Sequence, residues 1–409
     1  MSKEATELDL KSFKADVEAL NKKWGKNRLS NIIGTVRRLS FGSVSANYAT
    51  FGGVPYQKII VSSGVEHSGK TLGACQLMAQ YQHENPGKVC VYVDAENTLR
   101  GQEEFLCKMT GLSTEEGKFL RGEVDGMSAE EIFDFIEDLQ LKPWIGMIVL
   151  DSAPMLIPQE VLDSSSTVDK GMRASIAKSL GVFIRKMTTL TARVGNILLV
   201  INQVRIEKLH NGAIRYNEPC GYALNYYPSF KMRFGTRKFI NAKGEEISDS
   251  KATEAVGFRI SFSTTKSRVG ATNRGGGYIT YLYDSGMDYL GDLVATATTF
   301  GYITAGGAWI TLTDPLSGEV LTTTKGGDPL KFNGKQKLIT FLKEHPEFAE
   351  KYTERLEQAM SNSGNISLLA DEDLSVILEQ EQQVSNYDSE EEAEFKKEME
   401  RLDREEGKA

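Results

Sequence analysis

The chain is poor in cysteine and histidine and has no long apolar run. It holds four residues of each of these two types among 409. No two cysteines stand in a C-x-x-C spacing, so we expect reduced, buried thiols, as in a cytoplasmic protein. The histidines are scattered, which is more typical of structural or surface residues than of metal ligands. No apolar run approaches the ~20 residues of a membrane span, and the polar start predicts no secretory signal.

The overall charge is acidic, but the charges are segregated along the chain. Composition is that of a globular protein, with 40% hydrophobic and 25% charged residues and a net charge of −8. Residues 203–274 carry thirteen basic and six acidic residues, whereas residues 388–409 carry ten acidic and five basic ones. This asymmetry favours a basic nucleic-acid surface on the core and an acidic tail. The alternative is that these lysines and arginines only solvate strand faces.

The most informative motif is Gly-Val-Glu-His-Ser-Gly-Lys-Thr at residues 64–71. It matches the phosphate-binding loop G-x-x-x-x-G-K-[ST], in which lysine reaches the β- and γ-phosphates and the last hydroxyl serves Mg²⁺. An apolar strand at 58–61 precedes it and a helix over 71–81 follows, so the helix N-terminus faces the anion. The alternative is a glycine-rich turn before an ordinary helix. The predicted nucleotide-binding residues are Gly64, Val65, Glu66, His67, Ser68, Gly69, Lys70 and Thr71.

The central part of the chain alternates apolar strands with helices. We expect strands over 89–94, 147–151 and 196–201, a helix from the capping box at 128–131 to 140, and a helix over 169–191. This alternation predicts an α/β fold with a mostly parallel sheet covered on both faces. After residue 228 the strands become shorter and more alternating, up to Asp284.

Segments at both ends lie outside this pattern. Apolar residues at helical spacing predict an amphipathic helix over 10–24, which needs a partner for its apolar side. From about residue 290 short strands and helices mix, with Asn333 predicted to cap one helix and Pro346 in the first turn of another. The expected divisions are an N-terminal helix (1–30), a core with DNA-binding loops (31–288), a small C-terminal α+β domain (289–384) and an acidic tail (385–409) that is disordered or a lone helix.

Polar residues close the predicted parallel strands, at the sheet edge where ligands bind in open α/β folds. Asp151 ends an apolar strand 81 residues after Lys70, as an Mg²⁺-binding acid does; it could instead cap a turn. Glu96 is the candidate general base, the alternative being a solvated charge. Gln203 ends the third strand, where it can contact the γ-phosphate or the attacking water.

Two loops leave this same edge. Residues 159–170 include a serine-rich run, and residues 204–222 show no strong periodicity. Loops of this length tend to be functional or disordered, and mixed basic and apolar residues suit phosphate contacts combined with insertion between bases. The predicted DNA-binding residues of the second loop are Arg205, Ile206, Lys208, Leu209, Ile214 and Arg215.

The motifs at 64–71, 94–99, 149–152 and 201–205 together resemble the RecA family of strand-exchange recombinases, and its phage-encoded UvsX-like branch in particular. The likeness covers about residues 10–345. It adds Gly221, where the second DNA loop ends, to the predicted DNA-binding residues, and it makes the N-terminal helix an oligomerisation helix. It places Glu103 where the family stacks a tyrosine on adenine, so Tyr283 is predicted to supply the adenine-side contact. The implied site is catalytic Lys70, Glu96, Gln203, Lys266 and Arg268, the last two reaching a neighbour's nucleotide, with Thr71 and Asp151 for the metal.

The resemblance implies a RecA-like ATPase core using ATP and Mg²⁺. The expected function is a DNA-dependent ATPase that forms helical filaments of its own copies on single-stranded DNA, pairs homologous duplex and exchanges strands in recombination and repair. Expected partners include a single-strand-binding protein and a loader, in the cytoplasm of a host and with no membrane. Two alternatives stay open: a ring-forming helicase-like motor, and a nucleotide-binding recombination mediator.

Overall fold

The computed structural model describes residues 10–25, 29, 36–163, 172–208, 214–270, 275–323, 327–361, 368 and 377. The chain divides into two units, residues 1–37 and 38–409. In the first unit, α1 (Leu10–Trp24) is the predicted amphipathic helix, and Gly25 ends it with a φ of 118°. The side chain of Trp24 is 64% exposed, so the apolar side of α1 is open within its own unit.

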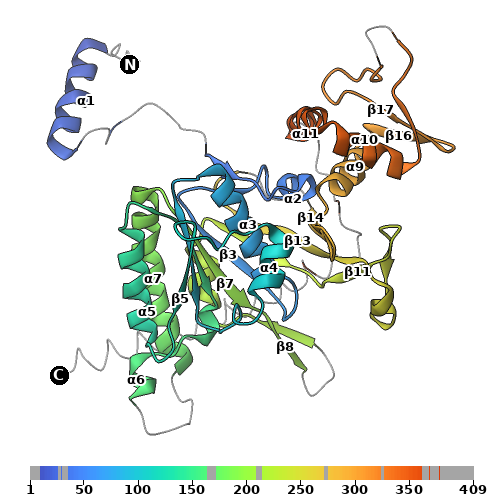
Figure 1. Cartoon of the computed structure of the whole chain (residues 1–409). Coiled ribbons are helices and arrows are strands. Elements are labelled where there is room, and N and C mark those ends of the chain that lie inside the picture. Colours follow the sequence, from blue (N-terminus) through green and yellow to red (C-terminus); the bar gives the residue numbers. More distant parts are fainter. Residues whose placement is uncertain are drawn as a thin grey trace, which may run out of the picture. The chain divides into compact units, whose positions relative to one another are not determined.

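A large mixed sheet forms the centre of the second unit (Figure 1). Among the described residues it contains eleven strands. They are β3 (Ile59–Gly64), β4 (Val89–Asp94), β5 (Phe119–Glu123), β6 (Ile145–Asp151), β7 (Ile197–Gln203), β10 (Phe230–Phe234), β11 (Lys238–Ile240), β12 (Glu246–Ile247), β13 (Gly257–Ser267), β14 (Gly276–Leu282) and β15 (Gly286–Met287).

The sheet order places the parallel strands side by side. It runs β12-β11-β13-β10-β3-β7-β6-β4-β5, with β14 on β13 and β15 on β14. From β10 to β5 every neighbouring pair is parallel, and from β10 through β13 to the far edge the pairs are antiparallel. The carboxyl ends of β3, β4, β6 and β7 therefore meet at one edge, as the strand–helix alternation predicts.

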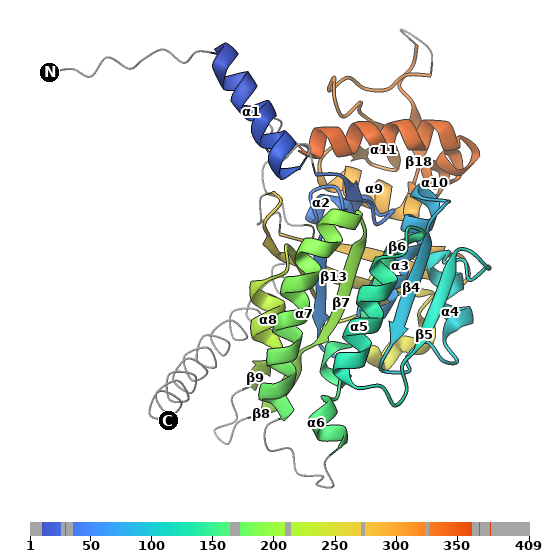
Figure 2. The ribbon, with the colours of Figure 1, turned by 90° about the vertical axis from the view of Figure 1, so that its left-hand side faces the viewer.

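Helices cover both faces of this sheet. Figures 1 and 2 show α3 and α4 against one face and α5 and α7 against the other. The bounds are α3 (Lys70–Glu84), α4 (Glu103–Thr110), α5 (Ala129–Gln140), α6 (Gln159–Leu162), α7 (Met172–Val194) and α8 (Gly221–Tyr226), with 3₁₀ turns η1 (Ala153–Met155) and η2 (Asp249–Glu254). Because each strand alternates its side chains, two apolar clusters form, one with α3 and one with α5 and α7. The predicted α/β fold with a mostly parallel central sheet is confirmed.

The remaining elements flank the sheet. They are the pair β1 (Arg38–Leu39) and β2 (Val54–Pro55), α2 (Val44–Ala49), α9 (Tyr289–Thr299), β16 (Ile303–Gly306), β17 (Trp309–Leu312), β18 (Lys331–Asn333), α10 (Lys335–Glu344) and α11 (Pro346–Ser361). The last six build a small α+β part with its own apolar cluster, which shares Val44 and Tyr48 with α2. The Asn47 side chain also donates to Glu357 Oε1 at 2.7 Å, which links this part to the core.

Two local expectations differ from the structure, and others fall on residues that it does not describe. Residues 204–222 are not an open loop, because β8 (Arg205–Lys208) and β9 (Ile214–Asn217) pair as an antiparallel ribbon. Asn333 does not cap α10; Gly334 occupies that position, and Asn333 ends β18 instead. The serine-rich run at 164–167, the start of the helix predicted from residue 169, and the acidic tail lie outside the described residues.

Candidate nucleotide-binding site

The phosphate-binding loop joins β3 to α3 with a backbone that only glycine fits at two points. Gly64 ends β3, and a Cβ there would lie 2.7 Å from the carbonyl oxygen of Phe234. Gly69 has a φ of 91°, and a Cβ there would lie 2.7 Å from Ile260 Cγ2. A Cβ at either position would therefore clash with backbone or core atoms that cannot easily move. The two glycines of the motif are thus required by the conformation of the loop. Between them, Glu66 and His67 are exposed and pair with each other at 3.5 Å.

Lys70 is drawn into the loop that it follows. Its Nζ donates to the carbonyl oxygen of Val65 at 2.7 Å and lies 3.5 Å from Ser68 Oγ. Burial lowers the pKa of Lys70, while the carboxylates of Asp151 and Glu96 act in the opposite direction. The ammonium group thus lies within the phosphate-binding loop and close to two carboxylates, where a positive charge is available to an anionic ligand.

Asp151 ends β6 beside the start of α3. Its Oδ2 accepts from Thr71 Oγ1 at 3.0 Å and from Thr98 Oγ1 at 3.1 Å, and also from the hydroxyl of Tyr92. Burial raises the pKa of the Asp151 carboxyl, and the hydrogen bond from Tyr92 opposes that shift. A hydroxyl and a carboxylate side by side are hard ligands of the kind Mg²⁺ takes alongside waters and substrate phosphates. The Thr71 hydroxyl and the Asp151 carboxylate, which lie within hydrogen-bond distance of each other, therefore fit a partly hydrated Mg²⁺ ion.

Glu96 and Gln203, predicted from separate strands, are brought into direct contact. The Gln203 side chain donates through Nε2 to both Glu96 oxygens, at 2.8 and 2.9 Å. Ser152 Oγ donates to Glu96 Oε2 at 2.9 Å, and the Glu96 backbone N–H donates to the carbonyl oxygen of Asp151 at 3.0 Å. The candidate base is therefore fixed between the ends of β6 and β7.

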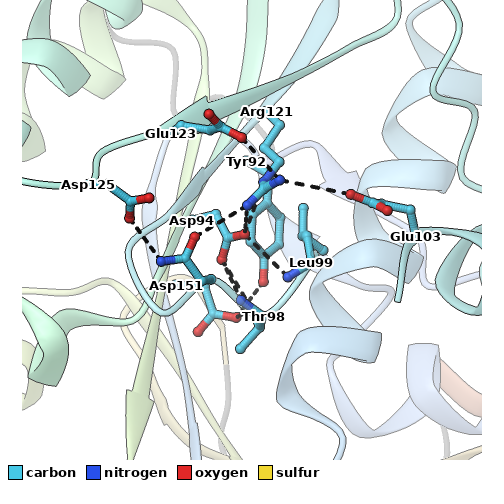
Figure 3. Close-up of polar contacts among 10 residues, drawn as sticks. Tyr92, Asp94, Thr98, Leu99, Glu103, Arg121, Glu123, Asp125 and Asp151 are labelled. Carbon is cyan, nitrogen blue, oxygen red and sulfur yellow. Dashed lines mark hydrogen bonds and ion pairs between the residues drawn. The ribbon is translucent and has the colours of Figure 1, made fainter. Parts of the chain in front are cut away.

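A second set of polar side chains surrounds Arg121 near the end of β4, and the sequence did not predict it. Figure 3 shows Arg121 between Asp94, Glu103 and Glu123. Arg121 pairs with the fully buried carboxylate of Asp94 at 3.0 Å, and Asp94 Oδ1 accepts from the Thr98 backbone N–H at 2.8 Å. The turn after β4 is thereby closed on itself. An arginine on β5 two positions before an acid gives no sign in the sequence of which turn it supports.

The two predicted cations of β13 lie far from the loop of their own chain. Ile260 contacts Gly69, whereas Lys266 lies six residues further along β13 and Arg268 just beyond its end. At 3.3–3.4 Å per residue, Arg268 is roughly 25 Å from Ile260. Both side chains donate to the carbonyl oxygen of Tyr226, so they lie on the same side of the sheet. Neither can reach the phosphates bound by their own loop.

Tyr283 lies at the opposite end of the same strand pair. It follows β14, its ring packs 5.8 Å from that of Phe258, and its N–H donates to the Val256 carbonyl oxygen. Its side chain is 38% exposed. Because Leu282 pairs with Gly257 at the start of β13, Tyr283 is at the sheet edge that carries the phosphate-binding loop.

Five of the seven predicted DNA-binding residues lie on the ribbon β8–β9, which projects beyond that edge at the lower end of Figures 1 and 2. Arg205 is exposed and Ile206 is 54% exposed. Lys208, Ile214 and Arg215 are in the paired strands and Gly221 begins α8, whereas Leu209 lies outside the described residues.

Buried ion pairs anchor the ribbon to the sheet. The charge count of the sequence had assigned their two cations to a basic surface. Glu218 Oε2 accepts from Lys231 Nζ at 3.0 Å and from Arg233 Nη2 at 2.9 Å, and all three side chains are at most 2% exposed. Two of the thirteen cations between 203 and 274 are therefore internal and add nothing to a basic surface. Lys231 and Arg233 are two residues apart, so in a strand both side chains point to the same face of the sheet. This spacing was the signal in the sequence that could have revealed their burial.

A parallel sheet, a glycine-bounded phosphate loop and an acid at the end of a neighbouring strand are typical of the P-loop class of nucleotide-binding proteins. The RecA N-terminal domain family matches residues 11–288, and the chain belongs to that family. The family prediction is thus confirmed, while the UvsX-like branch stays a prediction.

Curated proteins named Protein RecA are similar to this chain over most of its length. The protein of Campylobacter jejuni subsp. jejuni is 26% identical over 367 residues, which cover 87% of this chain and 96% of that protein. That of Nitratiruptor sp. is 24% identical over 375 residues (89% and 98%), and that of Helicobacter hepaticus is 24% identical over 372 residues (88% and 96%). Within the described residues, no helix is long and apolar enough to cross a membrane.

Proposed function

We propose that the protein is an ATP-dependent recombinase. It would hydrolyse ATP when bound to DNA, polymerise as a helical filament on single-stranded DNA, pair it with homologous duplex and exchange strands. The observation that carries this proposal is the pair Gln203–Glu96. Gln203 is the last residue of β7, and the exposed ribbon begins two residues later, so one strand end serves both the hydrolytic acid and the nucleic-acid element. A mediator that only binds nucleotide has no need of this link.

In the nucleotide site each side chain has a distinct task. The loop N–H groups and Lys70 bind the phosphates, and Thr71 with Asp151 holds Mg²⁺. The metal, when bound, neutralises charge on the phosphate oxygens. Glu96 orients and deprotonates the attacking water. Gln203 keeps the Glu96 carboxylate in place and turns toward the γ-phosphate or its water when these are present, which would shift β7 and the ribbon that follows.

Lys266 and Arg268 complete a site on the next subunit. They lie too far from their own loop to stabilise its phosphates, yet they project together from one side of the sheet. A filament brings such a cation pair to the neighbour's γ-phosphoryl group, where charge develops during transfer. α1, with its exposed apolar side, is the element that would dock on the adjacent core, and Tyr283 would contact the adenine.

On DNA, the ribbon supplies both contact types expected for single strands. Arg205, Lys208 and Arg215 would bind phosphates, and Ile206, Leu209 and Ile214 would insert between bases, with Gly221 closing the segment. We place the protein in the cytoplasm of a bacterial host, as a phage UvsX-like recombinase aided by a single-strand-binding protein and a loader.

A strand-exchange assay with ATP, Mg²⁺, circular single-stranded DNA and linear duplex tests the proposal. Joint molecules and nicked circles are expected, together with ATPase activity that depends on single-stranded DNA. Lys70→Ala protein is the control and should produce neither. Electron microscopy of the same mixture should show open helical filaments; closed rings would favour the helicase-like motor, and ATPase activity indifferent to DNA would overturn the proposal.

A further inference from the structure

The metal-binding acid of the proposed site is held by a buried tyrosine that the proposed function does not use. Tyr92 is in the middle of β4, and its side chain is 0% exposed. It points to the same face as Asp94, two residues on, and its hydroxyl donates to Asp151 Oδ2 on the neighbouring strand β6. A carboxylate only accepts hydrogen bonds, so the tyrosine is the donor.

Every hydrogen bond described for the Asp151 side chain ends on Oδ2. The donors are the hydroxyls of Tyr92, Thr98 and Thr71. One carboxylate oxygen has about two lone-pair sites, so three hydroxyls occupy it fully. The carboxylate is therefore pinned in rotation, and Oδ1 is the oxygen left for a metal or its waters.

Thr98 belongs to the same arrangement and is itself fixed. Its backbone N–H donates to Asp94 Oδ1 at 2.8 Å, and Asp94 is held by Arg121 (Figure 3). The turn after β4 thus presents the Thr98 hydroxyl to Asp151 Oδ2 at 3.1 Å, the shorter of its two contacts, since it also lies 3.3 Å from Asp94 Oδ1. Tyr92 in strand β4 and Thr98 in the turn after it thus both donate to Asp151 Oδ2 at the end of β6.

We propose that Tyr92, assisted by Thr98, is a positioning residue that orients Asp151 for Mg²⁺ in the nucleotide site. Because this rests on the proposed function, the inference concerns how strongly the metal is held and not whether ATP is the substrate. Loss of the Tyr92 hydroxyl lets the carboxylate rotate, so the Mg²⁺ concentration needed for tight nucleotide binding rises. Nucleotide binding without metal stays unchanged, because the loop and Lys70 are untouched.

The test is a Mg²⁺ titration of fluorescent ATP-analogue binding, with a parallel measurement in EDTA. For Tyr92→Phe the Mg²⁺ midpoint should rise about tenfold or more, the size expected for the loss of one hydrogen bond to a charged group. Thr98→Val should raise it in the same direction, and Thr98→Ser, which keeps the hydroxyl, should restore the midpoint of the unmodified protein.

Tyr281→Phe is the matched control. Tyr281 is another fully buried tyrosine of the same apolar cluster, but its hydroxyl donates to Gln76 at 3.2 Å and not to Asp151. The Mg²⁺ midpoint of Tyr281→Phe should therefore equal that of the unmodified protein. Midpoints for Tyr92→Phe and Thr98→Val within twofold of the unmodified protein would overturn the inference, as would an equal shift in Tyr281→Phe. If Tyr92→Phe does not fold, the Thr98 pair decides. An unmodified protein whose nucleotide binding ignores Mg²⁺ would instead count against the proposed function.

Discussion

Glu96 combines two constraints within one residue. Its backbone is tied to Asp151, and its carboxylate accepts hydrogen bonds from Gln203 and Ser152. The side chain is therefore pre-positioned at the meeting point of three strand ends. This arrangement suits a general base, which must keep one orientation toward its water.

Glu96→Gln should bind ATP normally and hydrolyse it about 10²-fold or more slowly, because an amide cannot accept the proton. The amide is isosteric and can still bond Gln203, so folding should be unaffected. Steady-state ATPase activity on single-stranded DNA and nucleotide binding are the two measurements.

Glu123→Gln is the matched control for this substitution. Glu123 ends the parallel strand β5 at the same sheet edge, and it faces Arg121 and not the hydrolytic site. Its hydrolysis rate should stay within twofold of the unmodified protein. A normal rate in Glu96→Gln would assign the water to another carboxylate.

Asp292 is a buried acid at the contact between α9 and α2. It accepts from Ser43 Oγ at 3.0 Å and from the Ser45 N–H at 3.2 Å. Burial raises its pKa to about 7, with the charge of Asp288 adding to the shift. The folded chain therefore holds a proton on Asp292 that the unfolded chain releases near pH 4.

The stability contributed by this neutral form is complete below pH 4 and is lost as the pH rises through 7. The free energy of unfolding should fall by up to about 1.4 kcal/mol per pH unit over that window from this group. Asp292→Asn cannot ionise, so its Tm relative to the unmodified protein should rise from pH 5 to about pH 7 and then level off toward pH 8. Thermal unfolding at four pH values measures this, with the exposed Asp284→Asn as control; parallel curves for Asp292→Asn and the unmodified protein would refute it.

At the scale of elements, the ribbon β8–β9 is attached at both ends to the sheet. Upstream, Gln203 bonds Glu96; downstream, Glu218 bonds Lys231 and Arg233 on β10, the neighbour of the phosphate-loop strand β3. The ribbon therefore has two separate routes to the nucleotide site. The second consists of charges buried away from water, so it is stiff and costly to break.

Glu218→Gln should lower the free energy of unfolding by about 3–5 kcal/mol, because two buried cations lose their carboxylate. Denaturant unfolding followed by circular dichroism gives the difference. Glu207→Gln, on the exposed face of the ribbon itself, should change stability by less than about 0.5 kcal/mol. Equal, small effects at both positions would show that the anchor carries no net stability.

Parallel strands and the residues at their ends could be predicted because apolar runs and the G-x-x-x-x-G-K-T spacing are local signals. β4 matches the expected strand 89–94 at both ends, and the capping box at Ser128 is formed in both directions. Tyr92 could not be found this way, since an aromatic residue in a buried strand is usually core, and its partner Asp151 is 59 residues away. The ribbon was missed because each of its strands is only four residues long, too short for alternation to stand out.

At the scale of the whole molecule, the proposed catalytic site draws on two chains. The loop and the acids lie at one end of β13, and the cations proposed to finish the site lie at the other. ATP hydrolysis should therefore require an interface between two chains, each of which contributes part of the site.

Lys266→Ala/Arg268→Ala protein should bind ATP but fail to hydrolyse it alone, and Lys70→Ala protein should also be inactive. Mixed one to one on single-stranded DNA, about one head-to-tail interface in four pairs an intact loop with intact cations, so part of the activity should return. ATPase activity is measured against mixing ratio. A straight line between the two inactive proteins, with no maximum, would place the action of both cations within their own chain.

The length of β13 has a further consequence for the proposed filament. In the proposed filament, the length of β13 between Ile260, which lies at the phosphate-binding loop, and Arg268, just beyond the far end of the strand, would set the spacing of successive ATP sites. One inserted residue between them would turn the cations to the other side of the sheet. Two would restore the side but lengthen the reach by about 7 Å. In that filament, the distance between neighbouring sites would change only in steps set by whole residues of the strand.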